Sequence, residues 1–198
     1  AHRKLIKEAE LVITRNEVAD AEAEIQRFKG ALEKTIAATQ KMADDLASRV
    51  GEKEAEIMQG HMMLLSDPML TGEIENSVKN DKVNCEFAIE NVCNMYADMF
   101  ASMGDELMQQ RATDMRDIKV RMQRTLMGLE SVDVSLLPKG SILVAKDLTP
   151  SMTAGINPEN VSGIVTELGG KSKGTGDPGS SCSKWPDGCS KGRRQCSP

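Results

Sequence analysis

The sequence has few aromatic residues and no long apolar run. Aromatic side chains make up 3% of its 198 residues, whereas there are 13 methionines. This composition favours helices packed through aliphatic and methionine side chains over a β-sandwich. Because no run of about 18 apolar residues occurs, we expect no membrane-spanning helix. The first residues lack the charged-then-apolar order of a signal peptide, so we expect a cytoplasmic protein.

The charge is acidic overall but unevenly spread. The formal net charge is −5. Residues 17–110 carry 19 acidic and 8 basic side chains, whereas residues 171–198 carry 6 basic and 2 acidic ones. An acidic body argues against binding to nucleic acid or an anionic membrane and favours a basic protein partner. The alternative is an ordinary solvated helical surface without a partner.

Apolar residues recur at helical spacing through the centre of the chain. Asn16 is expected to cap a long helix that ends at Gly51. Its apolar stripe comprises Val18, Ala21, Ile25, Phe28, Leu32, Ile36, Thr39, Ala43, Leu46 and Val50. A second helix is expected over about 54–66, ending before Asp67-Pro68, and a third begins after Asn84. The pattern continues to Gly128, so we predict a helical bundle.

Two ion pairs at helical spacing are expected in the last of these helices. Asp117 and Arg121 stand four residues apart, and Arg111 and Asp114 three apart. Such pairs contribute about 0.2–0.5 kcal/mol each, so they tune a helix rather than define it. Cys85 and Cys93 fall in a helical stretch and are interpreted as core thiols.

Strand signals lie at the two ends of the helical region. Leu11–Thr14 is expected to pair with later strands at Ile142–Ala145 and Val161–Thr166. Between these two, Thr149 precedes Pro150, which is typical of a helix start. Gly169 and Gly170 follow the last strand, where the backbone can approach a ligand or another chain closely. The pattern therefore predicts a strand–helix–strand unit.

Three collinear segments resemble Enzyme I of the bacterial sugar phosphotransferase system. They are GEKEAEIMQGHMMLLSDPML (Gly51–Leu70), QRATDMRDIKVRMQRTLMG (Gln110–Gly128) and AKDLTPSMTA (Ala145–Ala154). The resemblance covers roughly residues 8–171. It implies an α+β or α/β fold in which an all-helical subdomain is inserted into a small phosphohistidine-type α/β domain.

The resemblance also sets the expected domain boundaries. Residues 1–16 and 129–171 would form an incomplete phosphohistidine-type α/β domain, and residues 17–128 the helical subdomain. Residues 172–198 would be a tail foreign to the family. In the family, dimerisation belongs to a separate C-terminal barrel, so we expect a monomer.

In Enzyme I the helical subdomain binds HPr, a small histidine phosphocarrier whose docking face is basic and apolar. Residue by residue, the resemblance implies docking roles for Glu52, His61, Met63, Leu64, Asp67 and Arg111. Exposed Met63 and Leu64 beside carboxylates would suit such a partner. The alternatives remain open: a lone histidine at helical spacing is commonly packed, and residues 62–65 could be ordinary core.

The family passes phosphate from phosphoenolpyruvate through an active-site histidine to HPr, with magnesium in the barrel domain. That histidine belongs to a GG-x-TSHTAI motif, but this chain has GGKSKGTGDPG, with Gly174 at the histidine position. We therefore expect neither a catalytic residue nor a metal in this chain, and predict that it is inactive as a phosphotransferase. The alternatives are a non-catalytic HPr-binding module and a structural helical domain.

The tail after Ser172 is rich in glycine, serine and proline. Cys182, Cys189 and Cys196 are evenly spaced, which raises the possibility of a metal site. Structural zinc sites use closely spaced pairs and four ligands, and no histidine lies near these three cysteines. We favour a disordered, non-native end.

Overall fold

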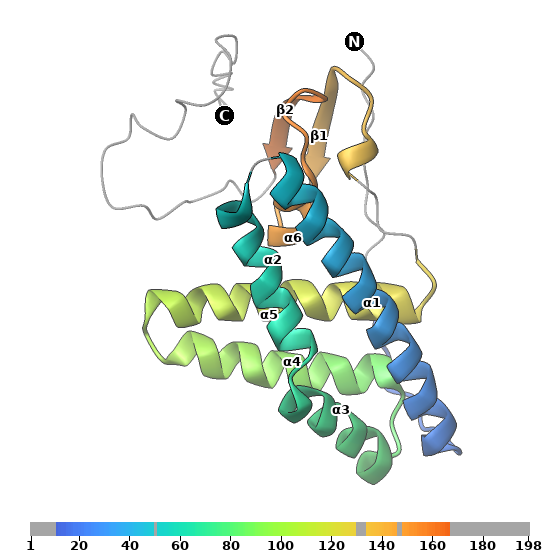
Figure 1. The fold of residues 1–198 in the computed structure, drawn as a ribbon. Coiled ribbons are helices and arrows are strands. Elements are labelled where there is room, and N and C mark those ends of the chain that lie inside the picture. The colour runs from blue at the N-terminus through green and yellow to red at the C-terminus, as the bar shows by residue number, and fades with distance from the viewer. Residues whose placement is uncertain (1–10, 50, 130–133, 146–147, 167–198) are drawn as a thin grey trace, which may run out of the picture.

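The computed structural model describes residues 11–49, 51–129, 134–145 and 148–166. Five long helices precede a short α/β segment (Figure 1). In chain order the elements are α1 (Ala21–Arg49), α2 (Glu52–Leu65), α3 (Pro68–Asp81), α4 (Cys85–Ser102), α5 (Glu106–Leu126), the 3₁₀ helix η1 (Val134–Leu136), β1 (Ser141–Ala145), α6 (Pro150–Gly155) and β2 (Val161–Thr166). We call α1–α5 the helical block and η1, β1, α6 and β2 the α/β unit.

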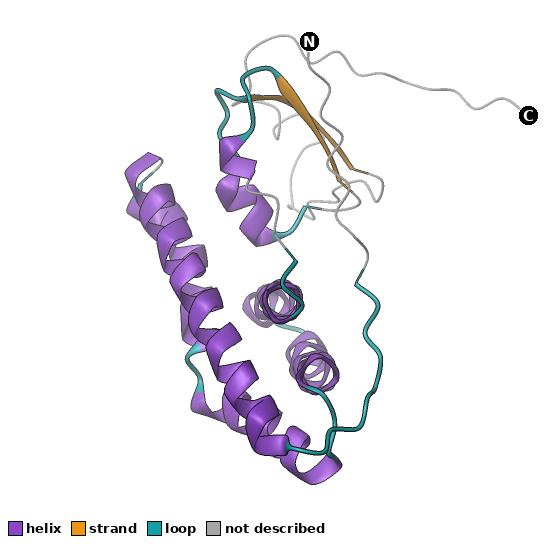
Figure 2. Ribbon diagram, turned by 90° about the vertical axis from the view of Figure 1, so that its right-hand side faces the viewer, coloured by secondary structure: helices purple, strands orange, loops and turns teal. Residues whose placement is uncertain are grey.

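The helical block consists of two layers of helices, with a further helix across one end. Helices α4 and α5 form an antiparallel hairpin, which Figure 2 shows end-on beside the long helices. Helices α1 and α2 cross that hairpin on one side, and α3 closes the end of the block away from the sheet (Figure 1). None of the helices in the described ranges is long and apolar enough to cross a membrane.

One apolar core fills the helical block. Its largest fully buried side chains include Phe28, Ile89 and Ile118, which come from α1, α4 and α5. Leu70 and Ile74 of α3 join the same core. The methionine-rich, aromatic-poor composition thus produces a helical core, as predicted.

The start of the chain differs from the sequence expectation. Helix α1 begins after Asp20, whose Oδ1 accepts a hydrogen bond from the amide of Ala23 at 3.0 Å, and not after Asn16. Residues 11–16 form no strand. Asn16 instead pairs with the segment before α4: its carbonyl accepts from the amide of Asn84 at 3.0 Å. The predicted strand was wrong: the backbone pairing at this end of the chain is made by residues 16–18 with the segment before α4, and not by Leu11–Thr14 with the later strands.

The α/β unit contains a two-stranded parallel sheet connected by α6. Strand β1 pairs with β2, with Leu143 opposite Ile164. Thr149 caps α6, since its Oγ1 accepts from the amide of Met152 at 3.3 Å. The strand–helix–strand unit was therefore predicted correctly, and the fold is mostly helical with a small parallel sheet. Gly169, Gly170, Gly174 and the three tail cysteines lie outside the described residues.

Candidate functional site

Helix α2 presents one exposed face and one buried face. Ala55, Met58 and Leu65 are buried at helical spacing, whereas Ile57 is 48% exposed and Met63 is 69% exposed. We call the exposed side the outer face of α2. Its exposed members are Glu52, Glu56, Ile57 and Met63, and half-buried Leu64 and buried Gly60 lie along its edge. Two large apolar side chains thus remain in solvent on a helix that already has a packed inner side.

Arg111 of α5 lies against the outer face at Gly60. A Cβ added to Gly60 would stand 2.7 Å from Nη1 of Arg111, so the guanidinium occupies the space that any other residue would fill. Met63 and Leu64 follow Gly60 by three and four residues, one turn further along the same side. Arg111 therefore lies against α2 one turn before Met63 and Leu64.

Asp67 and Glu52 mark the two ends of this surface. Glu52 is the first residue of α2 and is exposed. Asp67 caps α3 by accepting from the amide of Met69 at 2.8 Å. On the neighbouring helix α4, burial raises the pKa of the Tyr96 hydroxyl, and the negative charges of Glu73 and Asp67 raise it further. The apolar centre is therefore flanked by carboxylates.

His61 does not lie on the outer face. It has no exposed surface, because the helical spacing of α2 places it on the inner side with Met58 and Leu65. Its Nε2 is 3.3 Å from Oδ1 of Asp114, and its Nδ1 is 3.7 Å from Oδ2 of Asp117. The packed-histidine alternative thus describes its position.

The two ion pairs expected along α5 do not form among the described residues. Asp117 instead accepts hydrogen bonds from Ser151 of α6. Arg121 donates from Nη2 to Oγ1 of Thr39 at 2.7 Å. Both side chains form hydrogen bonds with residues of other elements. This part of α5 is buried between α1, α2 and α6, so contacts between elements replace contacts along the helix.

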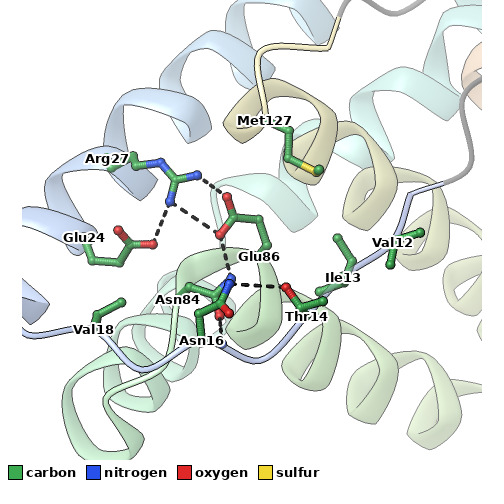
Figure 3. A pocket seen from close by; sticks show the side chains of 10 residues that line it. All are labelled: Val12, Ile13, Thr14, Asn16, Val18, Glu24, Arg27, Asn84, Glu86 and Met127. Atoms are coloured by element: carbon green, nitrogen blue, oxygen red, sulfur yellow. Dashed lines mark hydrogen bonds and ion pairs between the residues drawn. The ribbon is translucent and has the colours of Figure 1, made fainter.

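A polar cavity of about 350 Å³ lies where the segment before α1 meets α4 (Figure 3). Arg27 of α1 donates to both Glu24 and Glu86, and the side chain of Asn84 donates to Glu86 at 3.0 Å. Asn84 Oδ1 also accepts from the amide of Asn16 at 2.9 Å. Because these groups satisfy one another, the cluster serves as a junction between chain segments, and we assign it no ligand.

The pKa values of two buried thiols and of the Glu86 carboxyl are shifted. Burial raises the pKa of both Cys85 and Cys93 to about 12, and the thiols are free, in agreement with the prediction of core cysteines. Burial alone would raise the pKa of Glu86, but hydrogen bonds from Arg27 and Asn84 outweigh it, and the pKa is lowered.

The residues do not fit a magnesium site in the described part of the chain. There, no group of three His, Cys, Asp or Glu side chains is placed to hold a metal ion. No chemical step is therefore assigned to a metal here.

Sequence reasoning missed three contacts between elements. Gly60 could have been noticed as a glycine inside a helix, which costs stability unless close approach requires it. The contact between Asp117 and Ser151 joins residues 34 positions apart, and that between Asn16 and Asn84 joins residues 68 apart. No local pattern signals contacts of this kind.

The chain belongs to the PEP-utilising enzymes. The family model "PEP-utilising enzyme, N-terminal" matches residues 2–111, and "PEP-utilising enzyme, mobile domain" matches residues 137–175. Within this class the chain corresponds to the N-terminal portion of Enzyme I, the phosphoenolpyruvate-protein phosphotransferase of the phosphotransferase system.

Curated relatives and solved structures agree with this assignment. The chain is 39% identical to the phosphoenolpyruvate-protein phosphotransferase of Listeria monocytogenes and 36% identical to that of Bacillus subtilis, over 84% of this chain. It spans about 29% of the length of these relatives. An NMR structure of Enzyme I has a TM-score of 0.77 at 34% identity, covering 84% of this chain and 68% of that one. The N-terminal domain of Enzyme 1 – Nitrogen has a TM-score of 0.65 at 25% identity, covering 86% and 70%.

Proposed function

We propose that the helical block docks HPr through the outer face of α2. The observation that carries this proposal is the apolar pair Ile57 and Met63, exposed on a helix whose other side is fully packed. Exposed apolar side chains at the centre of a polar rim are typical of protein interfaces. Leu64, beside Met63, is partly buried and extends the apolar area toward the core.

The surrounding charges favour a basic partner. Glu52 and Glu56 flank one end of the apolar centre and Asp67 the other, within a region that carries a large acidic excess. Such a rim accelerates encounter with a basic docking face and suppresses acidic partners. Arg111, held over Gly60, supplies one cation for an acceptor on the partner. His61 supports this surface from inside the block.

Calorimetric titration of HPr into the full chain tests the docking proposal. Met63→Asp should weaken binding at least about tenfold, because it places a charge at the centre of the interface. The matched control is Met127→Asp, an exposed methionine at the opposite end of α5 from Arg111, which should leave the affinity within about twofold. Equal affinities for the two variants would contradict the proposal.

We further propose that this chain receives no phosphoryl group at position 174. A glycine offers no imidazole nitrogen, which is the nucleophile of the family reaction. The full family activity is phosphotransfer from phosphoenolpyruvate to HPr, with magnesium bound by a C-terminal domain. For the present chain we propose docking without phosphotransfer, as a monomer in the cytoplasm.

Incubation with radiolabelled phosphoenolpyruvate and the separately added PEP-binding domain of a relative tests this second proposal. No label should appear on the chain, while an intact relative treated in parallel becomes labelled. Label on the chain would contradict the proposal. A purely structural helical block is the remaining alternative, and it predicts neither HPr binding nor any effect of Met63→Asp.

A further inference from the structure

Helix α6 of the α/β unit is held at both ends by charged side chains of the helical block. At its first turn, the amide and the hydroxyl of Ser151 donate to Oδ2 and Oδ1 of Asp117, at 2.9 and 2.8 Å. At its end, Arg49 donates from Nη2 to the carbonyl of Ala154 at 2.9 Å and from Nη1 to that of Ile156 at 3.4 Å. A carboxylate thus meets the positive end of the helix and a guanidinium its negative end.

The carboxylate of Asp117 is buried inside the block, next to His61. Nδ1 of His61 on α2 is 3.7 Å from Asp117 Oδ2, and its Nε2 is 3.3 Å from Asp114 Oδ1. Gln110 donates to the same oxygen of Asp114 at 3.2 Å. His61 is fully buried, and both aspartates are 4% exposed. Helices α2 and α5 therefore meet at the group that holds the start of α6.

Apolar packing between the helical block and the α/β unit is limited compared with these polar contacts. The cores of the helical block and of the α/β unit are separate clusters. Between them, Ala154 of α6 packs against Ala43, Leu46 and Met58. Because Ala154 has a small side chain, this apolar contact alone would not fix the rotation of α6 about its axis. The polar contacts at Ser151 and at Ala154, which lie about 4.5 Å apart along the helix axis, fix that rotation.

We propose that Asp117 and Arg49 form a two-ended clamp on α6 that sets the orientation of the α/β unit on the helical block. The clamp spans α6, so it also fixes the Thr149–Ser151 turn relative to α2. This inference does not depend on HPr docking, because it concerns contacts within the chain.

Residual dipolar couplings of the backbone amides test the clamp in the full chain. In the parent, couplings from α1–α5 and from β1, α6 and β2 should fit one alignment tensor. In Asp117→Ala/Arg49→Met, the couplings of the α/β unit should need a separate tensor of lower magnitude, while those of the helical block stay unchanged. The single variant Asp117→Asn keeps an acceptor for the amide of Ser151. Its couplings should therefore fit one alignment tensor, as in the parent.

Controls separate the clamp from a general loss of charge. Asp98→Ala/Arg116→Met removes an exposed pair 3.7 Å apart and should leave one tensor. If the double clamp variant loses its β1–β2 cross-strand contacts, Ser151→Ala and Arg49→Met singly should each lower the order of the α/β unit. One shared tensor in all folded clamp variants, or two tensors already in the parent, would overturn the proposal.

Discussion

The helical block and the α/β unit differ in how their stability is built. The block has a continuous core drawn from all five long helices. The core cluster of the α/β unit has four buried apolar residues, namely Val134, Leu137, Leu143 and Val161, around a two-stranded sheet. A sheet of this size is marginal by itself, so it depends on packing against other elements. The comparison teaches that the block can present a binding surface alone, whereas the α/β unit relies on the block.

The largest expected effect comes from truncating the core of the helical block. Phe28 is 1% exposed, so Phe28→Ala should lower the free energy of unfolding by about 3–5 kcal/mol. Urea unfolding followed by helical circular dichroism measures this loss.

The matched change in the α/β unit is Leu143→Ala, at a residue that is fully buried in the smaller core. It should reduce hydrogen-exchange protection of β1 and β2 while leaving the helical unfolding transition in place. If Leu143→Ala shifted that transition as far as Phe28→Ala does, the two parts would form one cooperative unit and the comparison would fail.

A second prediction concerns the stability of the helical block at acidic pH. Because the pKa of Glu86 is lowered in the folded chain, its stabilising contribution is present above the unfolded-state pKa and is lost as pH falls through the folded-state value. Stability of the helical block should therefore decline below about pH 5. Glu86→Gln should flatten this decline in thermal melts recorded between neutral and acidic pH. An unchanged slope in the variant would show that the Arg27–Glu86 junction does not contribute.

A third prediction separates binding from stability within α2. Gly60→Ala should displace the Arg111 guanidinium, which lies at the end of a flexible side chain, and weaken HPr binding a few-fold without loss of stability. Gly30→Ala and Gly72→Ala are matched controls, since nothing lies within 4 Å of the added Cβ. They should stabilise the block by about 0.5–1 kcal/mol and leave binding unchanged. Equal binding by all three variants would remove Arg111 from the docking surface.

The smallest expected effect concerns the buried thiols. With pKa values of about 12, Cys85 and Cys93 should resist alkylation at pH 8 in the folded chain and react once urea unfolds it. Mass mapping of the modified peptides reads this out. Rapid alkylation of either thiol under native conditions would show that the α4 region of the core opens readily.

Sequence reasoning succeeded where the signal is local. The strand Val161–Thr166 and the cap at Thr149 follow from β-branched residues and a proline at the first helical position. It failed at Leu11–Thr14, because strand propensity does not identify a partner, and the pairing with the segment before α4 is made by residues 16–18 instead.

The candidate site divides in the same way. A resemblance carried over by motif does not distinguish the two faces of α2. It therefore grouped buried His61 with exposed Met63. The contact of Arg111 with Gly60 depends on how α5 crosses α2, which no pattern within one helix records.

The most direct test of the account is the amide spectrum of the ¹⁵N-labelled chain during titration with HPr. We predict progressive shifts at Ile57, Met63, Leu64 and Arg111, with the amides of β1 and β2 unchanged. An unaltered spectrum at about millimolar HPr, or shifts confined to the α/β unit, would contradict docking on the outer face of α2.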